Sequence, residues 1–104
     1  MLRLDEGPAD VVLAAGEEGR LSVTVGTDVG ADLAVEAHLI SPWGTWDWIG
    51  PAAVGAVLPG SGWVRLDFAV TPPPWTEPGE WWALVRVAAA GQLLYTPAVR
   101  VVVR

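Results

Sequence analysis

Residues 80–88 read EWWALVRVA, and the side chains in this stretch alternate in character. One alternate set carries no charge: Trp81, Ala83, Val85 and Val87. The other set contains Arg86. Successive side chains of a β-strand point to opposite faces, so the alternation predicts a strand with one buried and one outer face. Two adjacent tryptophans cannot both enter one core, and we expect Trp81 to point inward and Trp82 outward, with Leu84 beside it.

Several other stretches show the same alternation or a short unbroken apolar run, and Gly- and Pro-rich turns separate them. They are DVVLAA (10–15), RLSVTVG (20–26), DLAVEAHLI (32–40), WVRLDFAV (63–70) and LLYTPAVRVVV (93–103). We expect one more strand at 46–49 or 54–58. Pro97 has no N–H to donate, so the last strand should be an edge strand or be split there.

Strong strand signals without helix signals predict an all-β fold. We expect one domain over residues 1–104, an immunoglobulin-like antiparallel β-sandwich of about seven to eight strands with no significant helix. A partly open Greek-key barrel is the alternative. The first ten residues carry no obvious ordering signal, and the chain stops within a strand pattern. We therefore expect the domain to be excised from a larger multidomain protein.

The composition excludes several classes of function. Hydrophobic residues make up 52% of the chain, and the net charge is −6 with six scattered basic residues, which argues against nucleic acid as a partner. No apolar run approaches the roughly 20 residues that span a bilayer, so no membrane partner is expected. With no cysteine there is no disulfide and no thiolate metal site. The chain shows no signal peptide, and both an extracellular and a cytoplasmic location stay open.

Titratable groups that would support catalysis are scarce. His38 is the single histidine, and no nucleophile motif surrounds any serine. The GSG at 60–62 lacks the Lys and helix of a phosphate-binding loop and is interpreted as a turn. We expect no enzyme activity, no catalytic residue, no metal site and no cofactor.

Seven tryptophans are more than one small core needs, because each ring buries about 150–250 Å². Trp63 shares the outer face of its strand with Arg65 and Asp67, and Trp75 is expected to fold back as a lid on one end of the core. Trp43 lies near the tip of a turn. Trp46 and Trp48 share one face of a short strand, and the sequence leaves open whether that face is core or surface.

Three interpretations of the tryptophans follow. In the first, the rings fill or cover the core. In the second, they form a docking face for a neighbouring domain, because large exposed apolar patches usually mark a partner. In the third, they stack on sugar rings while polar side chains bind hydroxyl groups. The candidate contact residues for a domain or ligand are Trp43, Trp46, Trp48, Trp82, Glu36, His38 and Arg86. The last three also fit an ordinary solvated polar face.

The order of three segments resembles a known family. LAAGEEGRLSVTVGTD, HLISPWGTWDWIGP and LPGSGWVRLDFAVTPPPWTEPGEWWALVRVAAAG are similar to the Ig-like domain associated with bacterial glycosidases, found beside sugar-binding NPCBM modules or in α-galactosidases (the NEW-type domain). The resemblance covers about residues 12–103. The GTDVGAD turn and the high tryptophan content depart from the family pattern. The resemblance implies a non-catalytic accessory module and carries over no catalytic residue.

We therefore expect an accessory domain of a larger bacterial carbohydrate-active protein, which packs against and orients neighbouring domains of the parent chain. A carbohydrate-binding module that uses exposed tryptophans is one alternative, with glycan as the partner. A self-associating domain is another, in which a homodimer forms through an edge strand near Pro97. Fold analogy alone does not decide among them.

Overall fold

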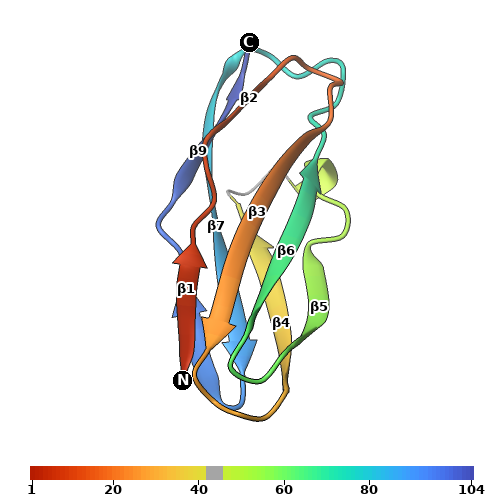
Figure 1. Cartoon of the computed structure of the whole chain (residues 1–104). Coiled ribbons are helices and arrows are strands. Elements are labelled where there is room, and N and C mark those ends of the chain that lie inside the picture. The colour runs from red at the N-terminus through yellow and green to blue at the C-terminus, as the bar shows by residue number, and fades with distance from the viewer. Residues whose placement is uncertain (42–45) are drawn as a thin grey trace.

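The computed structural model describes residues 1–41 and 46–104, without the side chain of Trp46, and folds them into two facing β-sheets (Figure 1). The strands are β1 (Leu2–Glu6), β2 (Val11–Leu13), β3 (Gly19–Thr27), β4 (Leu33–Ile40), β5 (Ala53–Leu58), β6 (Trp63–Val70), β7 (Gly79–Ala89), β8 (Gln92–Tyr95) and β9 (Val99–Val103). One 3₁₀ turn, η1 (Trp46–Trp48), precedes β5. The predicted all-β, immunoglobulin-like sandwich is confirmed, and the described residues contain no α-helix.

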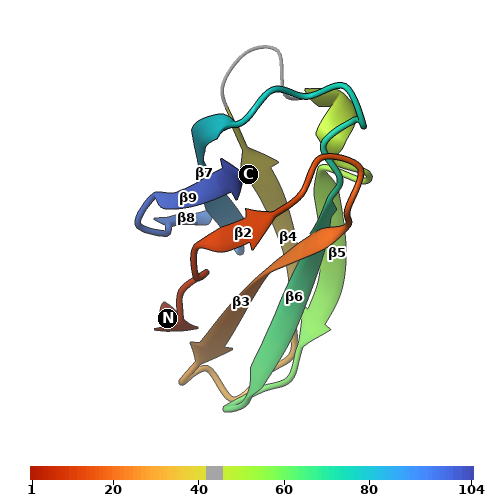
Figure 2. The same cartoon turned by 90° about the horizontal axis from the view of Figure 1, so that it is seen from above.

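The two sheets differ in size. One has the strand order β1-β3-β6, and the other has the order β2-β9-β7-β4-β5, with β8 beside β7 (Figure 2). Adjacent strands pair antiparallel except β2 and β9, which run parallel with Val11 opposite Val101. The sandwich is therefore antiparallel apart from this one pair. Gly7 and Pro8 interrupt strand pairing between β1 and β2, because proline cannot donate to a ladder, and the chain crosses there from one sheet to the other.

The first strand was missed from the sequence. The segment LRLDE alternates, and Leu2 and Leu4 of β1 pack against the core while Arg3 and Asp5 are exposed. The strand pairs antiparallel with β3, and its register shifts between Leu4 and Glu6. An ordering signal was therefore present in the first ten residues, although it is short.

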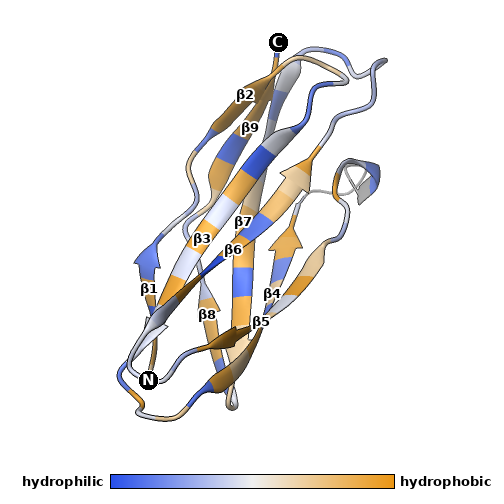
Figure 3. Cartoon of the chain, turned by 45° about the vertical axis from the view of Figure 1, so that its right-hand side comes forward, coloured by the Kyte–Doolittle hydropathy of each residue, from blue (hydrophilic) through white to orange (hydrophobic). Residues whose placement is uncertain are grey.

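The core lies between the inner faces of the two sheets, as the alternation predicts. Apolar residues alternate with polar residues along β3 (Figure 3). In β7 the residues from 81 to 89 are apolar apart from Arg86, and alternate ones are buried. The buried side chains include Leu21, Val23 and Val25 of β3, Leu66, Phe68 and Val70 of β6, Val35, Ala37 and Leu39 of β4, and Ala83, Val85 and Val87 of β7. The inner face of each sheet thus supplies one half of a continuous apolar layer.

Residues 46–48 form a 3₁₀ turn, whereas a strand at 46–49 was one of the two expectations. Trp48 closes η1, and its backbone carbonyl accepts a hydrogen bond from the Thr71 N–H at 2.7 Å. Ile49 then forms a single bridge with Val70. These contacts fasten the turn to the end of β6, so the additional strand forms only afterwards, at 53–58.

The expected lid over the core was also wrong. Trp75 is 82% exposed, whereas Pro72 of the same proline-rich connection is fully buried. The Pro72 carbonyl accepts a hydrogen bond from the Gly16 N–H at 2.7 Å. The rigid proline run places Pro72 over the end of the sandwich and turns the following indole into solvent.

The chain splits at Pro97, as expected, into β8 and β9. Strand β9 lies between β7 and β2, so it is paired on both sides and is not the edge strand considered for self-association. Strand β8 pairs with β7 alone, and β5 ends the sheet beside β4.

Candidate functional site

Three predicted contact residues meet on the outer face of the six-stranded sheet. His38 of β4 is opposite Arg86 of β7, and Arg86 is opposite Tyr95 of β8. Their strand neighbours Ala37 and Val87 are buried, so this row of side chains points away from the core. The sequence correctly placed His38 and Arg86 on one face, with Glu36 one position further along β4.

The polar groups of this row are only partly satisfied. The His38 Nε2 atom lies 3.1 Å from the Glu36 Oε1 atom. The His38 Nδ1 and Arg86 Nε atoms are shielded from solvent and have no hydrogen-bond partner within residues 1–41 and 46–104. Sheltered polar atoms normally find partners, so these two atoms are exceptions within the described residues.

Large apolar side chains surround the polar row on the same face. Trp82 is 47% exposed, as the alternation in β7 predicted. Three further exposed side chains are Leu93, Tyr95 and Val57. Leu93 is opposite Ala88 and Val57 is opposite Ala34, whereas Tyr95 is opposite Arg86 of the polar row. We call this surface, from Trp82 across β8 and β4 to Val57, the β7 face.

The tryptophans of the 43–48 segment do not join this surface as a set. Trp48 is 8% exposed and packs into the core, which is the first of the two alternatives left open by the sequence. Trp43 and the side chain of Trp46 lie outside the described residues. Of the four tryptophans proposed as contacts, Trp82 is the one that the structure places on an exposed face.

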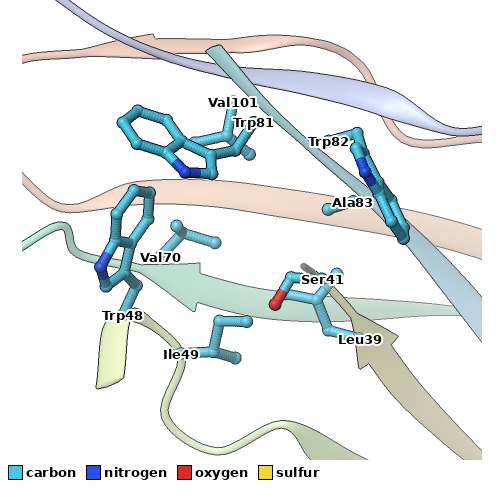
Figure 4. A pocket seen from close by; sticks show the side chains of 9 residues that line it. All are labelled: Leu39, Ser41, Trp48, Ile49, Val70, Trp81, Trp82, Ala83 and Val101. Carbon is cyan, nitrogen blue, oxygen red and sulfur yellow. The ribbon is translucent and has the colours of Figure 1, made fainter. Parts of the chain in front are cut away.

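A small hollow separates Trp48 from Trp82 (Figure 4). Its walls are formed by Leu39, Ser41, Trp48, Ile49, Val70, Trp81, Trp82, Ala83 and Val101. The hollow has a volume of about 10 Å³, which is close to the space that one water molecule requires. It is therefore a packing gap at the edge of the core and is too small for a sugar or a cofactor.

A larger hollow lies on the opposite sheet and was missed in the sequence. It has a volume of about 410 Å³ and is lined by Asp5, Glu6, Thr24, Trp63 and Arg65. The alternation had placed Trp63 outside with Arg65, and Trp63 is indeed 63% exposed. Strand β1 supplies both carboxylates of this hollow, Asp5 and Glu6. Because no strand was expected there, the sequence did not predict the site.

No grouping of three or more His, Cys, Asp or Glu side chains in the described part of the chain is placed to hold a metal ion. None of the described helices is long and apolar enough to cross a bilayer. The Arg65–Asp67 ion pair lies at the surface. The hydrogen bond from the Ser22 hydroxyl and the adjacent Arg65 guanidinium lower the pKa of Asp67.

These features define the chain as an all-β sandwich with two surface regions of interest. No protein family model matches the chain, and no curated protein sequence matches it. Solved structures do share its fold. A family 123 glycoside hydrolase from Clostridium perfringens matches with a TM-score of 0.67 and 12% identity, over 90% of this chain and 22% of that chain.

Two other structures match over the whole of this chain. One is a chain of the complex between zinc 2-glycoprotein and prolactin inducible protein from human seminal plasma, with a TM-score of 0.67, 13% identity and 94% of that chain covered. The other is WR4, a Caenorhabditis elegans MSP family member, with a TM-score of 0.52, 14% identity and 98% covered. At these identities the likeness shows the fold: a β-rich, Ig-like or MSP-type sandwich that occurs both as a part of a longer chain and as most of a chain.

Proposed function

We propose that this chain is a non-catalytic accessory domain of a larger carbohydrate-active protein, and that it packs against and orients a neighbouring domain. The observation that carries the proposal is the β7 face, where exposed Trp82, Leu93 and Tyr95 surround sheltered polar atoms without partners. Large apolar side chains grouped on one exposed face are typical of a surface that another protein covers.

The carbohydrate context has two supports. The residue pattern resembles the Ig-like NEW-type domain associated with bacterial glycosidases. A glycoside hydrolase from Clostridium perfringens contains a similar sandwich that accounts for about a fifth of its length. In such an arrangement the sandwich would supply a rigid surface, and the chemistry would take place in the neighbouring domain.

The face also suits a docking role in its details. A partner that supplies a carbonyl or carboxylate oxygen over the polar row would accept a hydrogen bond from the half-buried Arg86 guanidinium. Trp82 provides the large, rigid apolar contact that dominates many interfaces. Further along β7, the small residue Ala88, opposite Leu93, leaves room for side chains of the partner to reach the sheet.

The test begins with the open reading frame that encodes this chain. The chain is expressed alone and together with the adjacent encoded domain, and amide hydrogen exchange is compared on β7 and β8. We expect protection of β8 and of the strand around Trp82 in the longer protein, and glycosidase activity that resides in the added domain.

A Trp82→Ser variant should lose this protection, whereas Trp75→Ser should keep it, because Trp75 is exposed elsewhere. A reading frame that encodes no further domain would overturn the proposal. So would a longer protein in which the β7 face exchanges as fast as in the isolated chain.

Self-association is a second candidate, and the observation that favours it is β5. This strand ends the six-stranded sheet, pairs with β4 alone and has the uncharged sequence AVGAVL. Unprotected apolar edges are templates for pairing with another chain. We expect sedimentation velocity to show a concentration-dependent dimer that Val57→Lys abolishes; a monomer at all concentrations would refute this candidate.

A further inference from the structure

Two backbone features shape the hollow beside Trp63: Gly26 of β3 and the register shift in β1 between Leu4 and Glu6. Gly26 of β3 lies between Arg3 of β1 and Trp63 of β6 in the register of the three-stranded sheet. A Cβ atom at Gly26 would lie 2.7 Å from the Arg3 Nη2 atom and 2.5 Å from the Asp5 Oδ2 atom. The missing side chain therefore lets the Arg3–Asp5 pair lie across the sheet beside the indole.

The register shift in β1 gives the hollow its second carboxylate. Between Leu4 and Glu6 the strand carries an extra residue, Asp5, which pairs with no residue of β3. Such a bulge re-aims side chains, and here Asp5 and Glu6 both line the same hollow although they are adjacent in sequence. Two carboxylates and one indole thereby face a common space.

The next row across the sheet supplies further polar groups. Glu6 is opposite Thr24, and Thr24 is opposite Arg65. Neighbouring strands lie about 4.8 Å apart, so these three side chains form a continuous polar floor next to Trp63. Arg65 is held in place by Asp67 at 3.0 Å and by Ser22 at 3.2 Å.

Part of this floor has no internal partner. In the described part of the chain, neither the Glu6 carboxylate nor the Thr24 hydroxyl takes part in a hydrogen bond or ion pair. The Trp63 indole N–H and the Arg65 Nη1 group are likewise without a partner there. Donors and acceptors thus surround an exposed aromatic plane in a shallow, open hollow of about 410 Å³.

We infer that this hollow binds a neutral saccharide, with one sugar ring stacked on Trp63 and its hydroxyl groups bound by Glu6, Thr24 and Arg65. A single indole offers one flat apolar plane, which suits a sugar ring better than an organic cation that needs a cage of several aromatic rings. Asp5 is paired with Arg3, and Arg65 is paired with Asp67, so within the described residues Glu6 is the unpaired charge of the lining and anionic saccharides are disfavoured. The site lies on the sheet opposite the β7 face and does not depend on the proposed docking role.

The test follows the seven tryptophan indole N–H signals by NMR in the full chain. The probes are neutral oligosaccharides of mannose, galactose, glucose and N-acetylglucosamine, with a galacturonic acid oligosaccharide as the anionic comparison and tetramethylammonium as the cationic one. We expect one neutral series to shift the Trp63 signal saturably at concentrations up to about 10 mM, which corresponds to the weak affinity of an open site.

Matched variants separate this site from the other exposed tryptophans. Trp63→Ala should weaken binding by about tenfold or more, as expected for a central aromatic contact, and Trp63→Tyr should retain part of it. Glu6→Gln and Thr24→Val should each weaken binding severalfold. Trp82→Ala should leave the affinity unchanged, and far-ultraviolet circular dichroism checks that each variant is folded.

Several outcomes would overturn the inference. They are the absence of any Trp63 shift with all neutral probes, a shift caused by tetramethylammonium alone, or binding that Trp82→Ala removes and Trp63→Ala spares. Failure here would leave the docking proposal intact, since the hydrogen-exchange experiment reports on the other sheet.

Discussion

The rings of Trp48 and Trp81 meet edge to face, with centroids 4.8 Å apart and planes inclined by 72°. Trp48 comes from the turn η1 and Trp81 from β7, so the contact fastens the tryptophan-rich segment to the central strand of the larger sheet. Edge-to-face pairs are favourable because the positive edge of one ring meets the negative face of the other. The contact also explains why Trp48 is core while Trp82, the neighbour of Trp81, is surface.

Replacing Trp48 should therefore destabilise the fold strongly. We expect Trp48→Ala to lower the free energy of unfolding by about 3–5 kcal/mol, because it removes a buried ring and leaves a cavity. Trp82→Ala should change it by about 0.5 kcal/mol or less, as is usual for surface positions. Urea denaturation measures both, and equal losses would contradict the assignment of these two rings.

Fluorescence quenching should separate the exposed and buried indoles. Trp63, Trp75 and Trp82 are exposed, and we expect acrylamide to quench them efficiently. Replacing all three by Phe should lower the quenchable emission. If the triple variant stays as quenchable as the parent, Trp63, Trp75 and Trp82 are not exposed in solution.

Much of this arrangement follows from strand periodicity alone. The alternation in β7 distinguishes Trp81 from Trp82, and the alternation in β6 places Trp63 outside with Arg65. Both assignments need only the rule that adjacent strand residues face opposite sides. The break at Pro97 likewise follows from the missing N–H of proline.

What the sequence did not reveal depends on contacts between distant segments. The burial of Trp48 requires its carbonyl to accept a hydrogen bond from Thr71, and the exposure of Trp75 follows from the burial of Pro72. The hollow at Trp63 requires a bulge in β1 and a glycine on β3 at the same height. Local patterns do not specify which strands become neighbours, so these features appear only once the sheets are assembled.

Thr96 illustrates a buried polar group whose partners are fully assigned. Its hydroxyl accepts a hydrogen bond from the Val85 N–H at 2.9 Å and donates to the Pro97 carbonyl at 3.1 Å. Thr96→Val keeps the shape but leaves the Val85 N–H unpaired, which should cost about 1–3 kcal/mol in unfolding free energy. Thr96→Ser keeps the hydroxyl and should cost clearly less. Thermal denaturation compares them, and similar losses would show that packing, not the hydrogen bond, matters at Thr96.

Asp10 and Arg100 should make stability depend on pH at the end of the sandwich where β2 meets β9. The Asp10 carboxylate accepts the Arg100 backbone N–H at 2.8 Å and pairs with its guanidinium at 3.1 Å. The backbone hydrogen bond, followed by the side-chain bond, lowers the pKa of Asp10 below its ordinary value of 3.8. The folded state thus favours the ionised carboxylate more than the unfolded state does.

The resulting stabilisation is present in full above pH 3.8 and is lost as the pH falls through the lower pKa of the folded state. We expect Asp10→Asn to lower the urea midpoint at neutral pH and to differ progressively less from the parent below pH 3.8. Glu77→Gln, at an exposed carboxylate, should show no such convergence. A constant difference between Asp10→Asn and the parent across this range would mean that the charge of Asp10 contributes nothing beyond its hydrogen bond.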